Sequence, residues 1–210
     1  MENNNEIKDE STIPKEEVGV ENIKKTKLQK KAEGIWDLIK FAVIAFAIVM
    51  PIRMFIAQPF IVSGESMYPT FNDGEYLIID EISYIVGEPN RGDVVVFRYP
   101  SDPSRFFIKR MIGLPNEEIS IHGNEVKITN KDNPEGFTLV EPYINEDFNF
   151  DGTYQTKDEE YFVLGDNRNR SSDSRFWGIL PQELVVGRAY LRLLPIKNIS
   201  YMPGAYDENK

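Results

Sequence analysis

Ser66 and Lys109 have the side chains and the surroundings for acyl-transfer chemistry. Ser66 lies in the stretch Val62–Thr70, where a glycine and a proline bound a tight turn directly after an apolar segment. Lys109 interrupts the apolar run Phe106–Ile112. A lysine that has lost its water can be neutral at about pH 7 and can accept the proton of a serine hydroxyl. The pair therefore predicts a serine nucleophile that a lysine base activates.

Strand periodicity predicts the burial of Lys109. If residues 106–112 form a strand, Phe107, Lys109 and Met111 share one face, because side chains alternate between the two faces of a strand. An apolar environment disfavours the ammonium and lowers the pKa of a lysine from about 10.4 toward neutrality. The alternative is a lysine whose amine reaches solvent or pairs with one of the many carboxylates of the chain.

The composition excludes several other kinds of site. The 210 residues include no cysteine and one histidine, His122. Thiol nucleophiles, disulfides and zinc–thiolate sites are therefore excluded, and a Ser-His-Asp triad could use no other imidazole. A metal site would need carboxylates around His122 alone, so we expect no metal and no other cofactor. The formal charge of −10 argues against a nucleic-acid partner, since phosphate contact requires a basic face.

An apolar segment near the N-terminus has the features of a membrane anchor. Residues 41–52 carry no charge, and the apolar character extends over 35–57, which reaches the length of about 20 residues that a bilayer core requires. A lysine cluster free of acidic residues precedes it and marks the cytoplasmic side. We expect one transmembrane helix over 35–57 and a disordered cytoplasmic tail over 1–34. A cleavable signal peptide and a buried soluble helix are the alternatives.

The pattern beyond residue 57 predicts a mainly β protein outside the cytoplasm. Short apolar runs alternate with Gly, Pro, Asn and Asp, as in antiparallel sheets. We expect an antiparallel β-sheet catalytic domain over 58–200, an accessory β-hairpin or loop insertion at about 113–160, and a loose C-terminal tail over 201–210. The expected strands are Pro59–Val62, Tyr76–Ile79, Asp93–Tyr99, Phe106–Ile112, Tyr161–Leu164 and Leu184–Leu194.

One hairpin can be predicted down to its register. The runs 119–122 and 125–128 flank a Gly-Asn pair, which favours a two-residue turn. His122 then lies beside the turn on the solvent-facing side, so we expect a surface residue there and not a catalytic base. The pairs expected on the opposite face are Ile121 with Val126 and Ile119 with Ile128.

Four segments together resemble a known family. In the family's order, they match the characteristic boxes of bacterial type I signal peptidases (leader peptidases), which are Ser/Lys serine proteases. The resemblance runs from about residue 59 to residue 195, with the apolar anchor in place. A single box would carry little weight, whereas four in order are specific. The segments are Ser66–Thr70, Arg91–Phe97, Lys109–Pro115 and Gly165–Arg175.

The resemblance implies roles for individual residues. Ser66 is the expected nucleophile, Lys109 the expected general base, and Ser171 the hydroxyl expected to hydrogen-bond and orient the lysine. Asp173 and Arg175 are expected to form a structural ion pair near the site. The residues expected to shape the turn beneath the site are Gly165, Asp166 and Asn167. Those expected to line shallow substrate pockets are Phe60, Val62, Met67 and Ile108.

The implied activity is that of a membrane-anchored serine endopeptidase, which removes signal peptides from exported preproteins by cutting after small residues in an Ala-x-Ala pattern. Its implied partners are signal peptides and the lipid bilayer, and no cofactor is implied. The chain departs from the family at two points. Some members have an oxyanion-stabilising serine where this chain has Gly64, which leaves the Ser66 N–H as the clear oxyanion donor. Asn116 and Glu117 replace the usual Gly-Asp.

Two other functions fit parts of the pattern. A self-cleaving regulator related to SOS repressors shares the Ser/Lys pair, but such proteins usually carry a DNA-binding module where this chain has lysines and an apolar segment. An inactive membrane-anchored binding protein on the same scaffold would turn over no preprotein, and its behaviour would not depend on Ser66.

Overall fold

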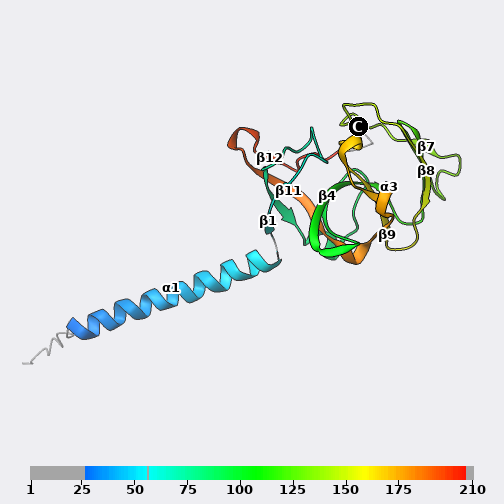
Figure 1. The fold of residues 1–210 in the computed structure, drawn as a ribbon. Coiled ribbons are helices and arrows are strands. Elements are labelled where there is room, and N and C mark those ends of the chain that lie inside the picture. The colour runs from blue at the N-terminus through cyan, green and yellow to red at the C-terminus, as the bar shows by residue number, and fades with distance from the viewer. Residues whose placement is uncertain (1–26, 56, 207–210) are drawn as a thin grey trace, which may run out of the picture. The chain divides into compact units, whose positions relative to one another are not determined.

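The computed structural model describes residues 27–55 and 57–206, which comprise one long helix and a β-rich unit (Figure 1). Helix α1 occupies Lys27–Phe55 and so begins earlier than the expected residue 35. Residues 1–26, where most of the disordered tail was expected, lie outside the described residues. The large apolar side chains of α1 are exposed, including Phe41 at 71% and Phe46 at 65%.

Within the described residues, no helix combines the length and the apolar character that crossing a membrane requires.

The β-rich unit is built around one antiparallel sheet, which confirms the mainly β fold expected from the sequence. The strand order is β1-β2-β11-β3-β4-β9-β10, and β12 pairs with β11 outside this path. Alternating burial along β2 shows why these residues form a half-buried strand: Leu77 and Ile79 are fully buried, and their neighbours are partly exposed. The bounds are β1 Ala57–Ile61, β2 Tyr76–Asp80, β3 Val94–Tyr99, β4 Asp102–Gly113, β9 Glu160–Leu164, β10 Leu180–Pro181, β11 Val185–Leu194 and β12 Ser200–Tyr201.

Strand β4 joins the two halves of the unit. It pairs with β3 along its length up to Arg110, and with β9 only over Arg110–Gly113. The other edge of residues 102–109 therefore has no strand partner among the described residues, and β1 is likewise the last strand on its side. At the far end of β4, a Cβ on Gly113 would lie 2.6 Å from Ile119 Cδ1 and 2.9 Å from Phe162 Cβ. Only glycine fits there, where the chain passes into the second sheet.

The second sheet lies within the insertion expected at about 113–160. Its order is β7-β6-β5-β8. The hairpin register is confirmed, because Ile121 pairs with Val126 and Ile119 with Ile128. His122 lies at the surface as expected, with 75% of its side chain exposed beside Asp151. The bounds are β5 Glu118–Gly123, β6 Glu125–Thr129, β7 Phe137–Thr138 and β8 Phe150–Gln155.

Short helical turns complete the unit. They are α2 Ser83–Val86, η1 Arg168–Arg170, α3 Ser174–Trp177, η2 Gln182–Leu184 and η3 Ile196–Asn198.

The C-terminal segment is packed where a loose tail was expected. Tyr201 pairs with Leu191 through β12, and the Met202 N–H donates to the Tyr190 carbonyl at 2.7 Å. Pro203 is buried. The expectation of a loose tail is therefore wrong for residues 201–206, because these residues bury apolar surface and supply backbone hydrogen bonds. Residues 207–210 lie outside the described residues.

The accessory sheet offers a test of its core. Ile121 is fully buried, so Ile121→Ala is expected to lower the free energy of unfolding by about 2–5 kcal/mol through lost burial and a residual cavity. The adjacent His122→Ala is the matched control and should change it by less than about 0.5 kcal/mol. Urea denaturation of both variants measures the difference, and equal losses would contradict the observed register.

Candidate active site

Ser66 lies in the turn that connects β1 to β2. Hydrogen bonds to a side chain and to the backbone fix the turn. The Gly64 N–H donates to the side-chain Oδ1 of Asp73 at 2.7 Å, and the Phe71 N–H donates to the Met67 carbonyl at 2.9 Å. The side chain of Met67 is fully buried and anchors the turn in the core. Ser66 itself is half-buried, so its hydroxyl remains accessible from solvent.

Lys109 reaches this hydroxyl from the middle of β4. Its Nζ lies 2.8 Å from Ser66 Oγ and donates a second hydrogen bond of 2.8 Å to the Ile108 carbonyl. The Phe107 ring lies 5.3 Å from the amine, and Lys109 is only 4% exposed. The expected surroundings of the lysine are therefore present, with its amine in hydrogen-bonding contact with the serine.

Two opposing effects set the pKa of Lys109: its burial and the charge of nearby carboxylates. Burial lowers the pKa of Lys109 from 10.5 to about 8, because the ammonium loses its hydration. The carboxylates of Asp173 and Asp166 act in the opposite direction, since they favour the charged amine. Burial is the larger effect, so a substantial fraction of the amine is neutral close to pH 8.

Each of these two carboxylates is bound to a buried arginine. Arg175 Nε lies 2.8 Å from Asp173 Oδ1, and the arginine also donates to the Arg168 carbonyl at 2.6 Å. The expected ion pair of Asp173 and Arg175 is thus present and almost fully buried. Asp173 Oδ2 also accepts from the Gly165 N–H at 3.1 Å, which ties the pair to the segment beneath the dyad.

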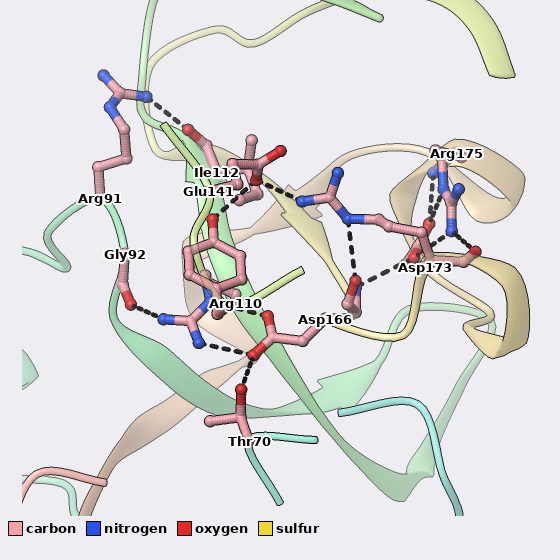
Figure 2. Close-up of polar contacts among 12 residues, drawn as sticks. Thr70, Arg91, Gly92, Arg110, Ile112, Glu141, Asp166, Asp173 and Arg175 are labelled. Atoms are coloured by element: carbon pink, nitrogen blue, oxygen red, sulfur yellow. Dashed lines mark hydrogen bonds and ion pairs between the residues drawn. The ribbon is translucent and has the colours of Figure 1, made fainter. Parts of the chain in front are cut away.

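Asp166 is held by residues that the sequence analysis did not single out. Figure 2 shows Arg110 and Thr70 both directed at its carboxylate. Arg110 donates to Asp166 Oδ1 at 2.8 Å and to Oδ2 at 2.6 Å, and Thr70 Oγ1 donates to Oδ2 at 2.5 Å. The next residue, Asn167, donates its N–H to the Ser66 carbonyl at 3.0 Å. The segment 165–167 therefore supports the serine turn directly.

Ser171 is placed differently from the expectation. Its Oγ is buried and has no hydrogen-bond partner among the described residues, so the expected bond to Lys109 is not formed. The two hydrogen bonds given above for the lysine amine go to Ser66 and Ile108. Ser171 instead lies against Gly165, where an added Cβ would also come within 2.5 Å of the Ser66 carbonyl. An orienting role for Ser171 stays a prediction.

A cavity of about 550 Å³ opens over the serine and the lysine. Of the expected pocket residues, Phe60, Val62 and Ile108 line it. Met67 does not, because its side chain turns inward and is only 1% exposed. The Phe60 and Phe106 rings meet edge to face at 5.2 Å, so the side chains of β1 and β4 contact each other beside the cavity.

The cavity rim also carries charge. Arg170 forms an ion pair with Glu65, directly before the serine, and both side chains are more than half exposed. Ser63 and Ser172 add hydroxyl groups to the lining. Within the described part of the chain, no three His, Asp or Glu side chains are grouped so that they could hold a metal ion.

The unusual Asn116–Glu117 step is accommodated in the turn before β5. Asn116 takes a left-handed conformation with φ 63°, which asparagine adopts more readily than most residues. Glu117 is buried and accepts from Arg91 at 2.7 Å and from the Leu114 N–H at 2.8 Å. These hydrogen bonds and the Arg91 cation hold the pKa of Glu117 below its usual value, despite its burial.

Comparisons with known proteins agree with this geometry. Residues 35–194 match the family described as "Signal peptidase, peptidase S26". A probable signal peptidase I-2 of Synechocystis is 35% identical over 192 residues, which cover 87% of this chain and 85% of the relative. The signal peptidase I of Leptolyngbya laminosa is 36% identical, with 81% and 86% covered. Signal peptidase IB of Staphylococcus aureus is 32% identical, with 81% and 95% covered. This chain belongs to the signal peptidase family, peptidase S26.

Proposed function

We propose that the protein is a serine endopeptidase in which Ser66 is the nucleophile and Lys109 the general base. The observation that carries the proposal is the 2.8 Å contact between Lys109 Nζ and Ser66 Oγ, made by a lysine whose pKa burial lowers to about 8. A neutral amine at that distance can accept the hydroxyl proton. The relatives above carry the name signal peptidase I, which is consistent with this chemistry.

The mechanism proceeds through an acyl-enzyme. Lys109 Nζ takes the proton of Ser66 Oγ as the oxygen attacks the carbonyl carbon of the scissile peptide bond. The ammonium then returns this proton to the departing amine, and the C–N bond breaks to leave an ester on Ser66. Water attacks the ester with the lysine again as base, which releases the carboxylate product and restores the serine. The Ser66 N–H is the proposed oxyanion donor, and the Ser63 and Ser172 hydroxyls on the cavity wall could supply a second.

We propose the signal peptides of exported preproteins as the substrates. Strand β1 and residues 102–109 of β4 each leave one edge without a strand partner among the described residues. A peptide in extended form can hydrogen-bond to such an edge and place its scissile bond at Ser66. The apolar lining from Phe60, Val62 and Ile108 suits small side chains before the cut.

We also propose that residues 35–57 anchor the chain in the cytoplasmic membrane, with residues 58–200 outside the cytoplasm. The described part of α1 does not by itself reach the length and apolar character that crossing requires. The support for the proposal is the uncharged run 41–52, the lysines that precede it, and the large apolar side chains exposed on α1. The expected span includes residue 56, which lies outside the described residues. An anchor of this kind would keep the enzyme at the surface where preproteins emerge.

The dyad is tested with a preprotein that has an Ala-x-Ala junction. Ser66→Ala removes the nucleophile and Lys109→Met removes the base, so each is expected to lower the rate of processing by about 10³-fold or more. Ser101→Ala and Lys127→Met are the matched controls, since Ser101 is exposed and does not line the cavity, and Lys127 is exposed on β6. Processing that survives both dyad substitutions would refute the proposal.

The pH dependence follows from the sign of the lysine shift. The protonated amine cannot act as a base, so the rate should be low in acid, rise through an apparent pKa of about 8, and level off above it. Phe107→Ala admits water beside the amine and should move this inflection toward 10.5, the ordinary lysine value. The profile of kcat/KM for both proteins measures the effect. A wild-type inflection near the ordinary lysine value would show that Lys109 is solvated.

The anchor is tested by fractionation of cells that produce the full chain. We expect the full chain in the membrane pellet after alkaline extraction, and a chain that begins at Gln58 in the soluble fraction. Ile44→Lys combined with Ile48→Lys introduces two charges into the apolar run and should release the full chain as well. Complete extraction of the wild-type chain would contradict the anchor and leave the dyad chemistry untouched.

A further inference from the structure

The C-terminal strap, residues Met202–Tyr206, packs behind the site without lining the cavity. It begins where the Met202 N–H donates to the Tyr190 carbonyl at 2.7 Å, and the Ala205 N–H closes a turn onto the Met202 carbonyl at 3.1 Å. Pro203, the second residue of the strap, is buried. The strap therefore has a defined place on the domain, although its sequence has no strand or helix pattern.

The strap makes its first contact near the site with a buried arginine, Arg110. Arg110, the residue after Lys109, is only 1% exposed. Its Nη1 donates to the Gly204 carbonyl at 2.5 Å and to the Gly92 carbonyl at 2.8 Å, while its other donors bind Asp166. Figure 2 shows this guanidinium between Gly92 and Asp166. The Gly204 carbonyl thus accepts one hydrogen bond from a buried cation whose other acceptors are the Gly92 carbonyl and Asp166.

The second contact is made with the serine turn. A Cβ on Gly204 would lie 2.6 Å from Thr70 Cγ2 and 3.1 Å from Val94 Cγ2, and the glycine has a φ of 76°. Only a residue without a side chain fits this slot unstrained. Thr70 lies four residues after Ser66 and donates to Asp166. One glycine therefore contacts the turn that carries the nucleophile and also the arginine that follows the base.

The end of the strap covers the same arginine. The Tyr206 carbonyl lies so close to Gly92 that a Cβ there would come within 2.6 Å of it. The Tyr206 ring meets the Tyr143 ring edge to face at 5.7 Å, and Tyr143 in turn lies under the Arg110 guanidinium, 3.8 Å from ring centroid to Cζ. The strap and Tyr143 thus both pack around Arg110, whose ion pair with Asp166 is almost fully buried.

We propose that the strap is a positioning element for the Ser66–Lys109 pair, with Gly204 as its positioning residue. This inference rests on the catalytic roles proposed above. Without the strap, water reaches the Arg110–Asp166 pair, the Gly204 carbonyl is lost as an acceptor, and Thr70 loses the surface against which it packs. β4 and the serine turn are then joined less rigidly. A displacement of about 1 Å between reacting groups can cost on the order of 10² in rate.

The experiment uses the full chain and two pairs of variants. A chain that ends at Tyr201 lacks the strap, and a chain that ends at Tyr206 keeps it and is the matched control. Gly204→Ala places a Cβ against Thr70, whereas Gly123→Ala is the control, because Gly123 also has a positive φ but nothing within 4 Å of an added Cβ. Initial rates on the Ala-x-Ala preprotein give kcat and KM, and circular dichroism with thermal unfolding gives the folded fraction.

The strap-less chain and Gly204→Ala are expected to lose about 10- to 100-fold in kcat at an unchanged KM, because the strap does not line the cavity. Both controls should keep the wild-type kcat. Gly204→Ala decides the question if the shorter chain fails to fold. A kcat that falls only in proportion to the folded fraction, or a KM that rises with it, would overturn the inference. An inactive wild-type chain would instead overturn the proposed function.

Discussion

The constraint on which the site depends is the cost of keeping an amine uncharged beside two buried carboxylates. Burial removes the water that would stabilise the ammonium of Lys109, while Asp166 and Asp173 favour its charged form. An arginine paired with each carboxylate limits its effect on the pKa of Lys109: Arg110 pairs with Asp166, and Arg175 pairs with Asp173. The carboxylates can therefore hold the backbone around Ser66 and Gly165 without returning the lysine to its ordinary pKa. Removing either arginine would leave an uncompensated charge in a dry site.

The sheet brings these groups together through a single long strand. β4 carries Lys109 and Arg110 on consecutive positions, so the amine faces the cavity while the guanidinium faces the Gly92 and Gly204 carbonyls behind it. The same strand continues into Gly113 and the accessory sheet. Lys109 thus lies on a strand that is paired with β3 over most of its length, which restricts the freedom of the backbone that carries it.

Much of this arrangement could be predicted from the sequence, because the relevant information was local. Period-two alternation placed Lys109 among apolar neighbours, and the Gly-Asn turn fixed the register of Ile119 and Ile121. The failures concern positions that depend on distant partners. The side chain of Met67 points into the core because the serine turn is closed by the hydrogen bond from the Phe71 N–H to the Met67 carbonyl. The C-terminal segment packs because Gly204 contacts Arg110 and Thr70, which lie far from it in the sequence. The sequence of residues 201–206 does not indicate that this segment contacts Arg110 or Thr70.

Among the described residues, β1 and residues 102–109 of β4 each leave one strand edge unpaired. Exposed strand edges tend to recruit other chains, and globular proteins usually shield them. Here the Phe60 and Phe106 rings meet edge to face between the two strands, while the backbone groups along these edges have no strand partner in the part of the chain that the structure describes. These edges therefore carry a risk of self-association, which a peptide bound there in the proposed manner would lower.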